Sequence, residues 1–433
     1  MKQKGGYAGP VVHYWRDCLN YIGPGLDWRY EGLIIGFLNL YERTKSECFL
    51  DMAVEAGDHL LSGQLRSGNF FNSNFESNVS LRGGATPHEP AACIGLLCLA
   101  EKLKSLHRDW KPYFVSARRN MDDYHLKVLW DENTGAFLQY RYDRVSHVPN
   151  KVATIVEFLL KLFEFTKDKK YLSYAARCGD FIVSQQDLDE YFGGIYQSDG
   201  RRHIITYYTA RCVPALLKLA EVTADDKYRN SALYACKFIK SMENRRGGFD
   251  FGYLKLDSDA FRLYKYPVWV AGSCDILRAL LSVGEYKKYS IKGNLRWVLS
   301  NVNENGGVRT SYGMNLRNKT GTCRGKPFWR DVLPVVGWND KALRLYSMLL
   351  GEGEQVHVTS GMDSIEVECR DALFYEDSSV IEVKGDENYL FRKDKMYSSN
   401  NFVKSLLLSF GKYYTFVNPG FYGIEAKIYS RIS

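Results

Sequence analysis

The chain has 433 residues, of which 45% are hydrophobic, 25% charged and 14% aromatic, and its formal net charge is +8. These values exclude a disordered chain, a collagen-like repeat and a small disulfide scaffold. The positive excess is small and scattered, so we expect no nucleic-acid partner, whereas an acidic small substrate is compatible with it.

No segment approaches the ~20 apolar residues of a membrane span, and the N-terminal residues lack the apolar core of a secretory signal. The ten cysteines include no Cys-x-x-Cys pair. We therefore expect a cytoplasmic protein with reduced thiols, no membrane span, no metal site and no cofactor.

The first predicted element is an apolar-periodic helix over residues 11–22, which ends in a Gly-Pro-Gly sequence. Six further helices are predicted over residues 31–43, 88–103, 150–165, 208–219, 268–281 and 327–350. Taking the first helical residue from the capping signals, these helices start at Trp28, Pro87, Pro149, Tyr207, Pro267 and Pro327. The gaps between the starts are 59, 62, 58, 60 and 60 residues, which indicates a repeat.

Each repeat continues with a polar turn, a second helix and a glycine loop. Thr166-Lys167-Asp168-Lys169-Lys170-Tyr171 is typical of these turns, and its aromatic residue is predicted to insert between the two helices. The sixth helix has no obvious helical partner after it. We therefore predict that the helix over 11–22 pairs with it and closes an (α/α)6 toroid of helical hairpins over residues 1–351.

After residue 351 the pattern changes to apolar and polar residues in alternation, as at 356–358, 364–369 and 380–383. Residues 352–433 are therefore predicted to form a small antiparallel β-domain. The fold class is mainly α with this β-domain appended.

In such a ring the N-terminal ends of the inner helices meet around one mouth, which favours anionic groups. The first turns of these helices carry residues that are unusual for packing. The catalytic candidates are Glu31, Asp331, Asp27, His88, Glu89 and Tyr208. The substrate-binding candidates are Trp28, Arg29, Asn150, Lys151, Tyr207, Arg211, Trp269, Trp329 and Arg330.

Aromatic faces beside amides and carboxylates suit a sugar, and two carboxylates can serve as acid and base at a glycosidic bond. We predict Glu31 and Asp331 as that pair, with Asp27 and Glu89 in reserve. Arg211 and Lys151 would hold an acidic group of the substrate. Each candidate also has a structural interpretation: a helix cap, an ion pair or a packed core aromatic. For Asp340, which is not a candidate, we expect a cap or an ion pair.

The sixty-residue hairpin period and the segment Leu-Tyr-Glu-Arg-Thr-Lys-Ser-Glu-Cys-Phe-Leu-Asp-Met-Ala at 40–53 resemble the six-hairpin glycosidase-like superfamily. This group includes unsaturated glucuronyl hydrolases, N-acylglucosamine 2-epimerase relatives and toroid polysaccharide lyases. The resemblance covers about residues 8–350 and implies a carbohydrate-active enzyme. It shows no subfamily's catalytic signature, so no catalytic residue is carried over from it.

Three alternatives remain open on this sequence. In a uronate lyase or epimerase, His88 or Tyr208 would remove a carbon-bound proton while Asn150 and Arg211 neutralise the carboxylate of the sugar. A terpenoid cyclase or prenyltransferase toroid also has Gly-Gly loops, which residues 246–249 resemble, but residues 257–260 lack the aspartate-rich acid motif. The third alternative is a non-catalytic glycan binder, against which the number of carboxylates at the mouth argues.

Overall fold

The computed structural model describes residues 26–71, 73, 88–141, 147–189, 191, 193–255, 261–284, 291–302, 308–314, 331 and 336–349. For residues 255, 336 and 337, and for the strands outside 26–349, it describes the backbone only.

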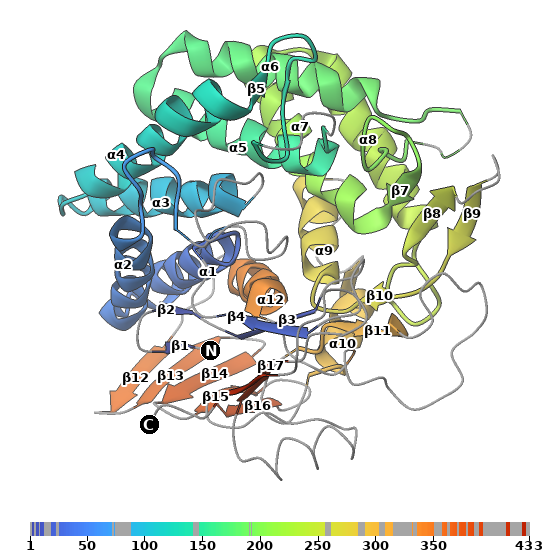
Figure 1. Cartoon of the computed structure of the whole chain (residues 1–433). Coiled ribbons are helices and arrows are strands. Elements are labelled where there is room, and N and C mark those ends of the chain that lie inside the picture. Colours follow the sequence, from blue (N-terminus) through green and yellow to red (C-terminus); the bar gives the residue numbers. More distant parts are fainter. Residues whose placement is uncertain are drawn as a thin grey trace.

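Six inner helices form a closed ring (Figure 1). They are α1 (Arg29–Thr44), α3 (His88–Ser105), α5 (Pro149–Thr166), α7 (Thr206–Thr223), α9 (Ser273–Ser282) and α12 (Val336–Leu349). Each packs against the next in chain order, and α12 packs against both α9 and α1. The predicted toroid of helical hairpins is confirmed.

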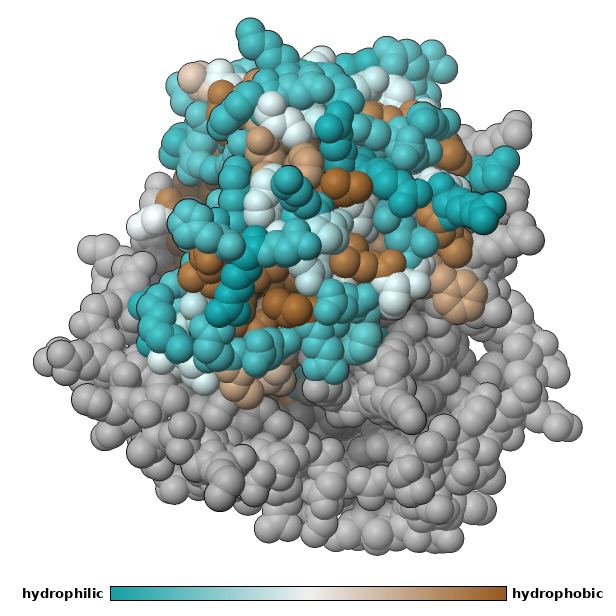
Figure 2. All heavy atoms as spheres, turned by 90° about the vertical axis from the view of Figure 1, so that its left-hand side faces the viewer, coloured by the Kyte–Doolittle hydropathy of each residue, from teal (hydrophilic) through white to brown (hydrophobic). Residues whose placement is uncertain are grey.

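Outer helices follow five of the inner helices. They are α2 (Glu47–Ser62), α4 (Lys111–Arg119) with the π-helix η2 (Asn120–Leu129), α6 (Lys169–Ser184), α8 (Asp226–Ser241) and α10 (Lys292–Leu299). The face over α2 and α4 is mainly hydrophilic, with small groups of hydrophobic side chains (Figure 2). Among the described residues, no helix is long and apolar enough to cross a membrane.

A tyrosine near the start of each of three outer helices contacts the preceding outer segment. The Tyr113 hydroxyl donates to Asp58, that of Tyr171 to Asp122, and that of Tyr228 to Asp180, over 2.8 to 3.0 Å. The aromatic residue of the turn therefore packs between helices, as predicted, and also links neighbouring repeats through its hydroxyl.

The helix predicted over residues 11–22 is wrong. The described backbone there forms an antiparallel pair, β3 (Gly9–Val12) with β4 (Leu19–Ile22). Its β-branched residues Val11, Val12 and Ile22 favour an extended backbone, and the strand pairing satisfies the peptide groups that a helix would have paired internally. Strand β3 contacts α12, where the sixth outer helix was expected.

One inner helix, α9, starts later than predicted. Residues Val268–Trp269 form the strand β10, which pairs with β11 (Ser311–Tyr312), so α9 begins only at Ser273. Helix α12 begins at Val336, and the predicted start at Pro327 lies outside the described residues.

Short strands surround the helical ring. The strands β7 (His203–Ile205), β8 (Gly252–Lys255) and β9 (Phe261–Tyr264) form one sheet, and β5 (Trp130–Asp131) pairs with β6 (Ala136–Phe137). At the N-terminus β1 (Lys2–Gln3) pairs with β2 (Gly6–Tyr7).

The predicted C-terminal β-structure is confirmed. One five-stranded antiparallel sheet contains, in order, β12 (His357–Gly361), β13 (Ser364–Cys369), β14 (Ala372–Asp377), β15 (Val380–Lys384) and β16 (Tyr389–Arg392). A separate pair joins β17 (Tyr413–Thr415) to β18 (Lys427–Tyr429), and β17 contacts β4. Because strands from both ends of the chain meet there, the domain boundary at residue 351 stays a prediction.

Two glycines on α1 let the ring close. A Cβ atom at Gly32 would lie 2.3 Å from Asp340 Oδ2 and 2.5 Å from the Asp340 carbonyl oxygen, and one at Gly36 would lie 2.6 Å from Leu343. The absence of side chains at these two positions allows α12 to approach the backbone of α1. This contact brings the last inner helix against the first.

Candidate active site

Four aromatic side chains gather at the N-terminal ends of the inner helices. Trp338 stacks on Trp269 with ring centroids 4.9 Å apart and meets the edge of Tyr207 at 5.0 Å. Trp28 lies 5.7 Å from Trp338 and 5.5 Å from His88. We call Trp28, Tyr207, Trp269 and Trp338 the aromatic cluster; three of them were sequence candidates, and Trp338 was not.

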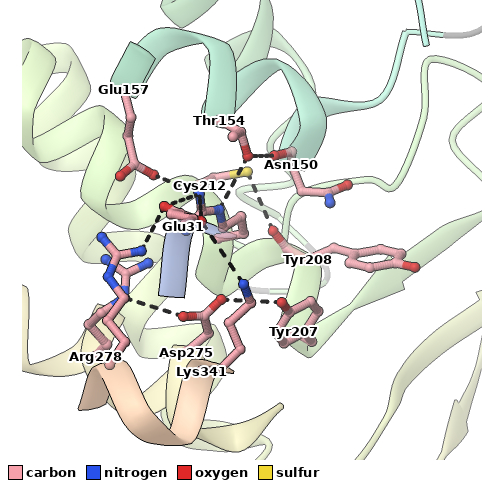
Figure 3. A network of polar contacts seen from close by, with 12 residues as sticks. Glu31, Asn150, Thr154, Glu157, Tyr207, Tyr208, Cys212, Asp275, Arg278 and Lys341 are labelled. Atoms are coloured by element: carbon pink, nitrogen blue, oxygen red, sulfur yellow. Dashed lines mark hydrogen bonds and ion pairs between the residues drawn. The ribbon is translucent and has the colours of Figure 1, made fainter. Parts of the chain in front are cut away.

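A buried network of charged side chains lies next to this cluster (Figure 3). Arg211 Nη2 donates to both oxygens of Glu31, over 2.9 and 3.1 Å, and Arg344 Nη1 donates to Oε1 over 2.6 Å. Lys341 Nζ is 4.0 Å from Glu31 Oε2 and 5.8 Å from the centre of the Trp28 ring. One carboxylate of α1 thus contacts cations of α7 and α12.

These cations fix the charge of Glu31. Burial opposes ionisation of this carboxyl group, but Arg211, Arg344 and Lys341 outweigh that effect and hold its pKa well below the usual range. Glu31 is therefore a permanent anion at neutral pH. It cannot serve as the proton donor of an acid–base pair, although it can stabilise a positive charge nearby.

Asp275 is a second fixed anion in the network. Its Oδ2 accepts a hydrogen bond from the Tyr207 hydroxyl over 3.2 Å, and its Oδ1 accepts one from Arg278 Nε over 3.3 Å. Burial raises the pKa of Asp275, but Arg278 and Lys341 outweigh burial and lower it to about 2. The Tyr207 hydroxyl links this charged network to the aromatic cluster.

Asp340 differs from both of these carboxylates. Its Oδ2 accepts a hydrogen bond from Lys341 Nζ over 2.6 Å, while its buried Oδ1 contacts no hydrogen-bond donor among the described residues. Burial raises the pKa of Asp340 to about 7, because Lys341 compensates only in part and the charges of Asp275 and Glu31 act in the same direction as burial.

On its α5 side the network ends at two polar residues. Arg211 Nε donates to Thr154 Oγ1 over 3.2 Å, and Thr154 Oγ1 donates to the backbone carbonyl of Asn150 over 3.2 Å. The side-chain Oδ1 of Asn150 is buried and meets no donor within the described part of the chain. Figure 3 shows the rings of Tyr207 and Tyr208 on the same side of the network, with Tyr208 reaching further from it.

Asp27 and Arg29, both predicted site residues, bind each other. The backbone N–H, Nε and Nη2 of Arg29 donate to the two oxygens of Asp27 over 3.0, 2.9 and 2.8 Å. Both side chains are buried. Asp27 thus accepts a hydrogen bond from the first backbone N–H group of α1 and forms a bidentate ion pair, so its described contacts are structural.

Three further candidates, Glu89, Asp331 and Lys151, form hydrogen bonds to loop residues. Glu89 accepts hydrogen bonds from the Phe70 amide and the Ser73 hydroxyl on Oε1, and from Asn120 Nδ2 on Oε2. Asp331 Oδ1 accepts hydrogen bonds from the Ser311 hydroxyl and the Met314 amide, over 2.7 and 2.8 Å. The remaining one, Lys151, donates to the side-chain oxygen of Gln139. Glu31 and Asp331, the predicted pair, therefore contact different sets of residues.

Two candidates, Trp329 and Arg330, lie outside the described residues. Among those that are described, no group of three histidine, cysteine, aspartate or glutamate side chains could hold a metal ion.

Several residues of the network were missed by the sequence analysis: Asp275, Arg278, Trp338, Lys341 and Arg344. A signal for them was present, because Asp275 and Arg278, like Lys341 and Arg344, are spaced by three in helices that are otherwise largely apolar. The same argument had selected Glu31. It applied equally to these residues, which follow the predicted helix starts at Pro267 and Pro327 by at least eight residues.

Comparisons with known proteins agree with the ring. No family model matches the chain, and no curated protein matches it. Among solved structures, cellobiose 2-epimerase from Bacillus thermoamylovorans is 14% identical with a TM-score of 0.57, over 80% of this chain and 92% of that one. The chain shares the toroid fold of this structure.

Two further solved structures share this toroid fold. An unsaturated glucuronyl hydrolase specific for heparin is 13% identical with a TM-score of 0.56, over 80% of this chain and 91% of that one. A D-mannose isomerase is 14% identical with a TM-score of 0.53, over 75% and 86%. At these identities the likeness shows the fold alone.

Proposed function

We propose that the protein is a carbohydrate-active enzyme that binds a sugar against the aromatic cluster. The observation that carries this proposal is the position of the four aromatic rings beside a buried set of charged and amide groups. A sugar ring has apolar faces, which stack on Trp28, Trp269 or Trp338, and a polar rim. Hydroxyl groups can both donate and accept, which suits the buried Asn150 Oδ1 and Trp28 Nε1 that have no hydrogen-bond partner among the described residues.

The proposed reaction is hydrolysis of a glycosidic bond in an acidic or modified oligosaccharide. Hydrolysis is supported by the buried carboxyl groups of the network, Glu31, Asp275 and Asp340, because cleavage of a glycosidic bond uses one carboxyl group as acid and a second one as base or nucleophile. An acidic group on the sugar is supported by the balance of charges. Four cations, Arg211, Arg278, Lys341 and Arg344, meet the three acidic side chains Glu31, Glu157 and Asp275, with Asp340 beside them.

A lyase or epimerase reaction is the second candidate. His88 is buried at the start of α3, with its ring 5.5 Å from that of Trp28, where a base could take a proton from a sugar carbon. This observation favours carbon-bound proton transfer on the same bound sugar, and the assay below separates the two reactions by their products.

The first experiment is a thermal-shift screen of the full chain with uronates, neutral sugars, amino sugars and prenyl diphosphates. A ligand that binds only the folded state raises Tm by mass action. We expect a shift with uronate-containing oligosaccharides, and no shift in a Trp28→Ala, Trp338→Ala variant that still unfolds cooperatively. A shift with prenyl diphosphates and with no sugar would refute the proposal.

Oligosaccharides that give a shift are then assayed for products. New reducing ends without ultraviolet absorbance indicate hydrolysis, an unsaturated product that absorbs indicates elimination, and a new epimer without either indicates epimerisation. Binding without any product over long incubation would leave a glycan binder and contradict the enzyme.

A further inference from the structure

Asp340 is a buried carboxyl group with an oxygen that accepts no hydrogen bond from a described residue; Glu157 Oε1 also accepts none, but it lies 3.6 Å from Arg211 Nη2. Asp27 has both oxygens bound to Arg29, and Glu31 accepts hydrogen bonds from two arginines. Asp340 uses Oδ2 for Lys341, and no described residue donates to its Oδ1. A buried acceptor without a donor is unfavourable, and this cost is avoided when the oxygen carries a proton or meets a ligand.

The surroundings of Asp340 bring its pKa close to neutral pH. Burial, Asp275 and Glu31 together raise its pKa to about 7 in spite of the ammonium group of Lys341. Asp340 thus lies beside two carboxylates whose pKa values are lowered, Glu31 and Asp275, while its own is raised, and such a division into different pKa values is typical of an acid–base site.

Asp340 also lies at the mouth. The charged or titratable groups that interact with it come from its own helix and from the first turns of three others: Lys341 of α12, Arg29 and Glu31 of α1, Tyr207 of α7, and Cys274 and Asp275 of α9. Trp338 of the aromatic cluster precedes it by two residues. Gly32 on α1 leaves the space that the carboxyl group fills.

We propose that Asp340 is the proton donor of this site. The inference rests on the proposed function. Asp340 transfers its proton to the glycosidic oxygen as the bond from that oxygen to the anomeric carbon breaks. Water then adds to the anomeric carbon and passes a proton to the Asp340 carboxylate, which restores the acid. Lys341 stabilises the charge that Asp340 carries between the two steps.

The experiment compares the wild-type chain, Asp340→Asn and Asp250→Asn on an oligosaccharide found by the screen. Asp250 is the matched control, because burial raises its pKa as well, while its side chain contacts Asn244 rather than the network. We expect Asp340→Asn to lose about 10²- to 10⁴-fold in kcat while the sugar-induced rise in Tm persists. Asp250→Asn should retain its kcat. The wild-type kcat should fall as pH rises through about 7, where Asp340 loses its proton.

Infrared spectroscopy measures the protonation state of Asp340 directly. The infrared carbonyl band of a protonated carboxylic acid should titrate near neutral pH in the wild-type chain and be missing from Asp340→Asn. Normal kcat in Asp340→Asn, or an unchanged band, overturns this inference and leaves the proposed function intact. Loss of the sugar-induced Tm shift in Asp340→Asn assigns the residue to binding and overturns the inference too. A wild-type chain that turns over no sugar overturns the proposed function together with it.

Discussion

Replacing Glu31 by glutamine tests whether the buried network stabilises the ring. The substitution keeps the shape of the side chain and removes its charge, which leaves Arg211, Arg344 and Lys341 buried around a neutral amide. Removing one partner of a buried ion pair typically costs about 3–5 kcal/mol. With two arginines within 3.1 Å of this carboxylate, we expect the free energy of unfolding to fall by about that amount.

The assay is urea unfolding at pH 7, followed by tryptophan fluorescence and circular dichroism. The control is Glu42→Gln, since Glu42 pairs with Lys45 at 2.6 Å but its side chain is 41% exposed. That change should cost less than about 1 kcal/mol. Equal losses for the two variants would refute the argument from burial.

The pH dependence gives a second check on Glu31. Its pKa is lower in the folded chain than in the unfolded one. The ionised side chain therefore contributes fully to the free energy of unfolding at any pH above its ordinary pKa of 4.5. The contribution is lost as pH falls through the folded-state pKa. The difference between wild-type and Glu31→Gln stability should therefore shrink in acid, and a difference that grows as pH falls would show that the sign is wrong.

Three other substitutions test separate contacts by the same unfolding assay. Gly32→Ala should cost about 1–3 kcal/mol, since its Cβ would meet the backbone and side chain of Asp340, whereas Gly293→Ala, where nothing lies within 4 Å, should be neutral or stabilising. Tyr228→Phe should lower the free energy of unfolding by about 0.5–1.5 kcal/mol, because the hydroxyl group loses its hydrogen bonds to Ala176 and Asp180. An unchanged free energy of unfolding would show that these hydrogen bonds do not stabilise the fold. Asp275→Asn should destabilise at pH 7 and lose this effect toward pH 2, because the folded-state pKa of Asp275 is about 2; a constant difference would contradict that pKa.

Much of the ring could be predicted because its signals are local. Caps, prolines and turn residues act within one helical turn, and the predicted starts at Trp28, Pro87, Pro149 and Tyr207 lie within one residue of those of α1, α3, α5 and α7. The segment over 11–22 failed for the opposite reason. Its strands are stabilised by pairing with each other and by contacts with distant segments, which no local pattern contains.

The same distinction between local signals and contacts with distant segments applies to the site. The types of residue at the mouth followed from the helix starts, and Glu31 was found because a charge in an apolar helix needs a partner. The hydrogen-bond donors that each carboxylate contacts come from neighbouring helices and loops, so a local sequence pattern does not predict them. Asp331 and Glu89 accept hydrogen bonds from loop amides and hydroxyls. Asp340, for which the sequence suggested a cap or an ion pair, pairs with Lys341 through Oδ2, while no described residue donates to its Oδ1.

The contact between α1 and α12 makes the network dependent on closure of the ring. Glu31 lies in the first turn of α1, whereas Lys341, Arg344 and Asp340 lie on α12, about 310 residues later. Gly32, the neighbour of Glu31, is one of the two glycines at which these helices approach each other closely. Any change that separates these helices therefore both destabilises the fold and removes the cations that hold Glu31 ionised. For that reason a loss of activity in a variant of this contact assigns a chemical role only when its unfolding free energy is measured beside it.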